Sequence, residues 1–131
     1  IEVIIGAVND PAFGPVVMFG LGGTATELFA DRAFTIVPVT DLDAEALIRQ
    51  PRSSALLRGH RGSEAVDIEA LEDLVLRVGR LADTVPELAE LDLNPVIARP
   101  DGAFVVDARA RLEPTGAPLV QPIRRLDRPT R

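Results

Sequence analysis

The feature that most constrains the fold is a turn flanked by two alternating runs, at residues 91–96 and 104–111. The turn, residues 99–102, reads R-P-D-G, with proline at its second and glycine at its fourth position, as a type I turn prefers. The first run sets Leu91, Leu93 and Pro95 against Asp92, Asn94 and Val96, and the second sets Phe104, Val106, Ala108 and Ala110 against Val105, Asp107, Arg109 and Arg111. Two alternating runs around a strong turn predict an antiparallel β-hairpin.

The polar positions of this hairpin form a candidate metal site. If Pro100 and Asp101 form a two-residue loop, the ladder places Asn94 opposite Asp107. Directly opposed residues have β-carbons about 4.5–5.5 Å apart, and residues two apart on a strand share a face, so Asp92 joins the pair. Two carboxylates and an amide oxygen suit Mg²⁺, which completes its shell with water and substrate phosphates.

Two alternatives to the metal site stay open at this point. A bulge at Gly102 shifts the register by one residue and sends Asp107 to the opposite face. Alternatively, the polar face is simply covered by water, which the presence of Arg109 and Arg111 on the same face also suits. The residues alone do not choose among these arrangements.

The rest of the chain mixes strand and helix patterns. Residues 67–83 place apolar side chains at i, i+3, i+4 and i+7, with Leu81 among them, which predicts an amphipathic helix. Shorter patterns predict strands at 2–8, 15–19 and 34–39, and helices at 24–30 and 41–48. Asp41 or Asp43 is the expected cap of the last of these helices. This order predicts an α+β fold, a mostly antiparallel sheet flanked by helices.

A glycine-rich segment between the second strand and the first predicted helix is a second candidate site. The backbone amides of Gly20, Gly22 and Gly23 can approach an anion, and the helix that follows adds a partial positive charge. Glu27 belongs to the same segment as a candidate nucleotide-binding residue. The alternatives are a tight turn and a capping box of Thr24 and Glu27, and the spacing is not that of G-x-G-x-x-G.

Composition excludes several chemistries. All 14 basic residues are arginine, so neither a Schiff-base lysine nor the lysine of a phosphate-binding P-loop is present, and there is no cysteine for thiol catalysis. The single histidine, His60, lies in a glycine-flanked loop more typical of an exposed side chain than of a phosphoryl acceptor. The net charge of −6 disfavours nucleic-acid binding, and no apolar run is long enough for a membrane span, so a cytoplasmic protein is expected.

Three segments resemble one family. They are D-P-A-F-G-P-V-V-M-F-G-L-G-G-T-A-T-E-L at 10–28, R-G-H-R-G at 58–62, and E-L-D-L-N-P-V-I-A-R-P-D-G-A-F-V-V-D-A-R at 90–109. They closely resemble the ATP-grasp domain of NDP-forming acyl-CoA synthetases, a family that includes the ADP-forming acetate–CoA ligases. The resemblance covers residues 1–112 as the C-terminal lobe of that fold, and leaves residues 113–131 as a proline- and arginine-rich tail.

The resemblance implies roles for the hairpin residues. Asn94 and Asp107 match the positions that hold Mg²⁺ on ATP or ADP, which favours the opposed register. Asp92 matches the acid near the phosphoryl group that passes to a histidine, so a catalytic role is expected for it. The implied reaction is acid + CoA + ATP = acyl-CoA + ADP + phosphate, through a phosphohistidine.

The resemblance also implies partners outside this chain. The first ATP-grasp lobe with its phosphate-binding lysine, the CoA-binding domain and the phosphohistidine segment would lie elsewhere, so His60 is not that histidine and the isolated piece should be inactive. An alternative comes from A-P-L-V-Q-P-I-R-R-L at 117–126, which resembles the end of bacterial fusions with a GNAT-type acetyltransferase. In some of these fusions the ligase-like region is thought to be a regulatory binding module.

Overall fold

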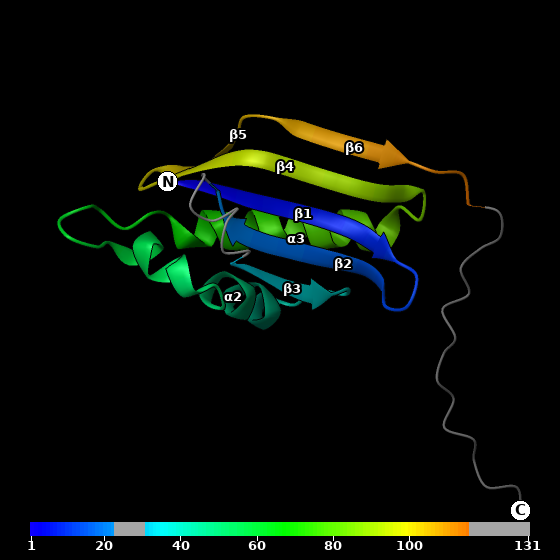
Figure 1. The fold of residues 1–131 in the computed structure, drawn as a ribbon, viewed down its shortest axis with the longest axis horizontal. Coiled ribbons are helices and arrows are strands. Elements are labelled where there is room, and N and C mark those ends of the chain that lie inside the picture. The colour runs from blue at the N-terminus through cyan, green and yellow to red at the C-terminus, as the bar shows by residue number, and fades with distance from the viewer. Residues whose placement is uncertain (23–30, 116–131) are drawn as a thin grey trace, which may run out of the picture.

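A computed structural model describes residues 1–22 and 31–115 of the chain (Figure 1). The elements are β1 (Glu2–Asp10), β2 (Gly14–Leu21), β3 (Arg32–Ile36), α2 (Asp41–Arg49), the 3-10 helix η1 (Arg52–Arg58), α3 (Ile68–Thr84), β4 (Leu88–Arg99), β5 (Gly102–Val105) and β6 (Ala108–Leu112). The strands form one antiparallel sheet in the order β3-β2-β1-β4-β5, and β6 also pairs with β4. The predicted α+β class is confirmed, while the helix predicted at 24–30 lies outside the described residues.

Helix α3 covers one face of this sheet, behind β1 and β2 in Figure 1. Its first turn is capped by the Asp67 carboxylate, which accepts a hydrogen bond from the Ala70 amide at 3.1 Å. The predicted apolar stripe is buried at Leu71, Val75, Val78 and Ala82. The prediction was wrong at Leu81, which is 41% exposed because it lies at the edge of the stripe.

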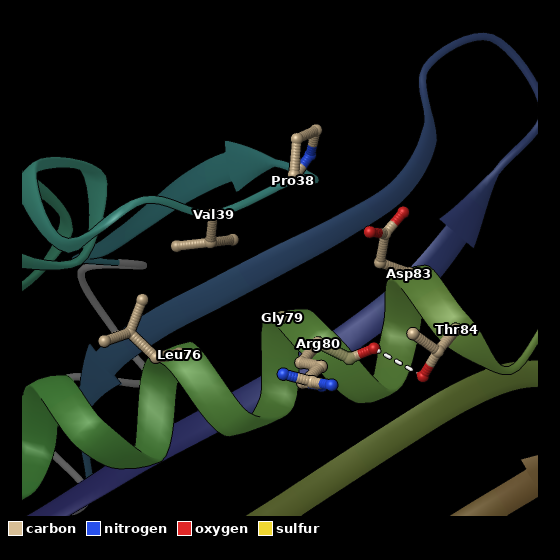
Figure 2. Close-up of a pocket in the computed structure, with 7 residues that line it drawn as sticks. All are labelled: Pro38, Val39, Leu76, Gly79, Arg80, Asp83 and Thr84. Atoms are coloured by element: carbon tan, nitrogen blue, oxygen red, sulfur yellow. Dashed lines mark hydrogen bonds between the residues drawn. The ribbon is translucent and has the colours of Figure 1, made fainter.

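Gly79 brings the chain after β3 close to α3. A β-carbon at Gly79 would lie 2.7 Å from a methyl group of Val39, so only glycine permits this approach without movement. Figure 2 shows Val39 facing the helix between Leu76 and Gly79. Beside this contact is an open groove of about 400 Å³, lined by Pro38, Val39, Leu76, Gly79, Arg80, Asp83 and Thr84.

Helix α2 begins with a reciprocal cap that the sequence analysis assigned to the wrong residue. The Thr40 hydroxyl accepts a hydrogen bond from the Asp43 amide at 3.1 Å, and the Asp43 carboxylate accepts one from the Thr40 amide at 3.0 Å. Thr40 is therefore the N-cap, rather than Asp41 or Asp43. The reason is that Thr40 and Asp43 have the spacing of a capping box, which satisfies two amides at once.

The two faces of the sheet differ in what covers them. The core lies between the sheet and the helices, and its largest fully buried side chains are Phe19, Ile5, Leu47, Ile48, Leu57 and Leu71. No described helix covers the opposite face, which we call the open face. On it Phe34 is 59% and Ile36 56% exposed, and Val8 is exposed on β1, across Val16 of β2 from Ile36. None of the described helices is long and apolar enough to cross a membrane.

Asp31 fastens η1 to the start of β3. Its carboxylate accepts hydrogen bonds from the amides of Arg52 and Ser53, both at 2.8 Å, and from the Ser53 hydroxyl. The hydrogen bonds from the Ser53 side chain and backbone hold the pKa of Asp31 below its ordinary value of 3.8. The ionised carboxylate therefore stabilises the fold above pH 3.8, and this contribution is lost as the pH falls through the lowered pKa.

We expect Asp31→Ala to lower the free energy of unfolding by about 1 kcal/mol at pH 7, the usual cost of losing a cap. The difference from the wild type should shrink as the pH falls below about 4, because the wild-type carboxylate then becomes protonated. Urea unfolding at pH 7 and at a pH below about 4 measures this difference in the free energy of unfolding. Asp73→Ala, which removes only an exposed ion pair with Arg77, is the control and should cost less than about 0.5 kcal/mol. Equal losses in both variants would contradict the anchoring role.

Candidate metal and nucleotide site

The hairpin of β4 with β5 and β6 adopts the predicted register. Arg99 pairs with Gly102 next to the turn, and Asp92 pairs with Arg109 further along. Between these ladders the Asn94 amide donates a hydrogen bond to the Asp107 carbonyl oxygen at 3.0 Å. The two-residue loop is thus confirmed, and the alternative register with a bulge at Gly102 is wrong.

The pairing of β4 with β1 contains a bulge that the sequence analysis missed. Val3 pairs with Val96 and Ile5 pairs with Leu93, so one residue of β1 faces two residues of β4. Because of the extra residue, Leu93 and Val96 both point into the core, and Val96 has no exposed surface. The prediction that Val96 shares a face with Asp92 and Asn94 was therefore wrong.

The polar side chains predicted as a metal site lie on the face of the sheet away from α3. Asp92, Asn94 and Asp107 are all exposed there. Arg109 stands opposite Asp92, and its Nε lies 3.8 Å from a carboxylate oxygen of Asp107. The structure thus brings Asp92 and Asn94 of β4 next to Asp107, which lies between β5 and β6.

The donor set fits a hard divalent cation that keeps much of its own hydration. The described part of the chain has no group of three or more histidine, cysteine, aspartate or glutamate side chains able to hold a metal. A cation at the hairpin would therefore use the Asn94 amide oxygen with the Asp107 carboxylate and take its other ligands from water or phosphate. That is the coordination that Mg²⁺ favours. Zn²⁺ would need more nitrogen or sulfur donors than this face offers.

The glycine-rich segment is only partly described. Gly20 lies inside β2, where it pairs with Ile4 and Arg32, and the Gly22 amide donates a hydrogen bond to the Glu2 carbonyl at 2.8 Å. The Gly22 amide is thus used by the sheet, and a nucleotide-binding role for Gly20 and Gly22 stays a prediction. Gly23 and Glu27 lie outside the described residues, so their nucleotide-binding role stays a prediction.

One residue near the site had not been identified from the sequence. Gly6 pairs with Met18 on one side and with Asp92 on the other. A β-carbon there would lie 3.0 Å from the Leu91 carbonyl oxygen, so a larger residue would press against the strand that carries the site. A glycine inside an otherwise β-branched strand was the available signal, because such a glycine often marks a close approach.

His60 stands apart from these residues. It lies exposed in the loop between η1 and α3, where its carbonyl oxygen accepts a hydrogen bond from the Ser63 amide at 3.2 Å. Arg61 in the same loop has a positive φ of 52°.

Comparison with known proteins identifies the class of domain that has this antiparallel sheet and this opposed polar pair. The ATP-grasp domain family matches residues 1–112, and the chain belongs to this family.

Two relatives are ADP-forming acetate–CoA ligases. The β subunit of ADP-forming acetate–CoA ligase I from Pyrococcus furiosus is 48% identical over 108 residues, which cover 82% of this chain and 47% of the subunit. ADP-forming acetate–CoA ligase I from Archaeoglobus fulgidus is 44% identical over 108 residues, covering 82% of this chain and 16% of that protein. This chain therefore spans about half of the Pyrococcus subunit.

A solved structure shows the same fold. The dinucleotide-forming acetyl-CoA synthetase 1 of Ca. Korarchaeum cryptofilum superposes with a TM-score of 0.83 and 52% identity, covering 86% of this chain and 53% of that one. That protein was crystallised with coenzyme A and Mg-AMPPCP, and its phosphohistidine segment points towards the nucleotide-binding site. These relatives come from archaea, while the similarity to bacterial fusions at 117–126 lies outside both the matched and the described residues.

Because of the bulge, Val96 lies on the core side of β4, and this placement can be tested. Val96→Asp should lower the free energy of unfolding by roughly 3 kcal/mol or more, because it buries an unpaired carboxylate. Val106→Asp, at a position that is 64% exposed, is the matched control and should change it by less than about 0.5 kcal/mol. Urea unfolding measures both changes. Uninterrupted alternation along β4 would leave Val96 on the polar face, so a change for Val96→Asp as small as that for Val106→Asp would contradict the bulge.

Proposed function

We propose that the full-length protein is an NDP-forming acyl-CoA synthetase, and that this chain supplies the half of its ATP-grasp domain that holds Mg²⁺ and the nucleotide phosphates. The reaction is acid + CoA + ATP = acyl-CoA + ADP + phosphate, through a phosphohistidine. The observation that carries the proposal is the alignment of Asn94 with Asp107 on the open face of an ATP-grasp sheet. The relative with Mg-AMPPCP and coenzyme A, at 52% identity, supports it.

Each donor has a distinct task in this proposal. The Asn94 amide oxygen and the Asp107 carboxylate would hold Mg²⁺, and the bound ion supplies positive charge beside the phosphate oxygens. Asp92 is exposed on the same face, two residues before Asn94, and would lie next to the phosphoryl group in transfer. Its carboxylate can orient the incoming histidine or hold its proton.

The other half of the site would come from the rest of the protein. About half the length of the Pyrococcus subunit and of the Korarchaeum chain is outside this chain, and no lysine is available here to contact the phosphates. Val8, Phe34 and Ile36 are exposed apolar residues of an area across β1 to β3 on the open face, and at its edge Val8 pairs with Glu90 of the strand that carries Asp92 and Asn94. We infer that the first ATP-grasp lobe packs over this area, while the CoA-binding domain and the phosphohistidine segment belong to other parts of the protein.

The metal assignment is tested with Asp107→Ala in the full-length protein. Calorimetric titration with ADP is done in the presence and in the absence of Mg²⁺. The Mg²⁺-dependent affinity for ADP should be at least about tenfold weaker in the variant than in the wild type. The control is Asp101→Ala in the turn of the same hairpin, where Asp101 pairs with Arg99 at 3.1 Å, and it should bind as the wild type does. Equal Mg²⁺-dependent affinity in wild type and Asp107→Ala would overturn the proposed function.

A further inference from the structure

Arg109 occupies an unusual position among the candidate metal ligands. It is the cross-strand partner of Asp92, and it lies two residues from Asp107 on the same face. Its Nε is 3.8 Å from the Asp107 carboxylate, and its own side chain is 84% exposed. A positive side chain therefore neighbours both carboxylates to which the proposed function gives the metal and the phosphoryl group.

The next arginine on β6 has a different environment. The guanidinium of Arg111 pairs with Glu90 at 3.1 Å and with Glu113, and these carboxylates raise its pKa further. In the described part of the chain, the ion-pair partner of Arg109 is Asp107. The two arginines share strand, face and charge, so they differ mainly in which acids they face.

A loose and solvated ion pair such as Arg109 with Asp107 contributes little to the stability of the fold. It does affect what else the carboxylate binds, because a guanidinium and a divalent cation compete for the same oxygens. The repulsion between the two cations weakens metal binding as long as nothing negative arrives with the metal. Phosphate groups remove that repulsion, because they accept hydrogen bonds from the guanidinium while they coordinate the metal.

We propose that Arg109 is a positioning residue that makes loading of the divalent cation depend on the nucleotide. Without nucleotide, the guanidinium stays beside Asp107 and disfavours the bare cation. When a nucleoside diphosphate or triphosphate arrives with its cation, the cation takes Asp107 and the guanidinium turns to the phosphate oxygens. The inference rests on the proposed function, because it needs the metal at Asp107.

The experiment measures the two affinities separately in the full-length protein. The affinity for Mn²⁺ in the absence of nucleotide is measured by titration with Mn²⁺ alone, with electron paramagnetic resonance detecting the free ion. The affinity for ADP is measured by calorimetry in excess Mg²⁺. In Arg109→Gln the affinity for Mn²⁺ alone should rise, and that for ADP with Mg²⁺ should fall, each on the order of fivefold. Arg109→Lys should keep the wild-type order of affinities, because it retains the charge.

Arg111→Gln is the matched control and should leave both affinities within about twofold of the wild type, because its charge acts on Glu90 and Glu113. Changes in opposite directions in Arg109→Gln support the inference, since a merely structural role would not strengthen Mn²⁺ binding. Mn²⁺ binding that does not strengthen, or that changes equally in both variants, overturns it. Asp107→Ala distinguishes failure of the proposed function from failure of the role of Arg109. If Asp107→Ala abolishes Mg²⁺-dependent ADP binding while Arg109→Gln has the same two affinities as Arg111→Gln, only the role of Arg109 is contradicted.

Discussion

The bulge in β4 is the constraint on which the rest of the site depends. One residue of β1 faces Asn94 and Pro95 together, so Leu93 and Val96 both reach the core while Asn94 stays on the open face. Burying a side chain such as Leu or Val contributes about 1.5–3 kcal/mol, and burying an unpaired polar group costs a comparable amount. A strand without the extra residue would have to expose Val96 or bury polar side chains. The bulge satisfies both requirements and directs the polar donors away from α3.

The segment from β5 to β6 keeps its alignment with β4 on both sides of this bulge. The ladders on either side of Asn94 have the same register, and the Val106 amide bridges the gap by donating to the Pro95 carbonyl oxygen at 3.0 Å. Asp107 therefore stays level with Asn94 even though neither residue belongs to a regular ladder there. The turn at Gly102, whose φ is +147°, fixes this alignment from the other end of the hairpin. Turn and bulge thus position the donor pair together.

These features were not equally visible in the sequence. The turn at 99–102 predicted the hairpin but left two registers open, and it was the family resemblance that favoured the observed one, in which Asn94 lies opposite Asp107. The bulge was missed because the letters alternate up to Val96, although Pro95 was a signal, since a proline inside a sheet is found at bulges and edges. Helix η1 was missed for another reason. It is held by Asp31, 21 residues before Arg52, and no local pattern reports such a contact.

The open face of the sheet places chemical limits on what can cover it. Beside β4 and β6 it carries charged and amide side chains, which an apolar partner could bury only at a cost in free energy. Across β1 to β3 it carries Val8, Phe34 and Ile36, which gain by leaving water. A suitable covering layer is therefore anionic and metal-bearing on one side and apolar on the other. In the proposed function, a nucleotide phosphate chain with its cation and the first ATP-grasp lobe would together have both properties. A second copy of this acidic chain would instead bring more carboxylates to a face that already holds them.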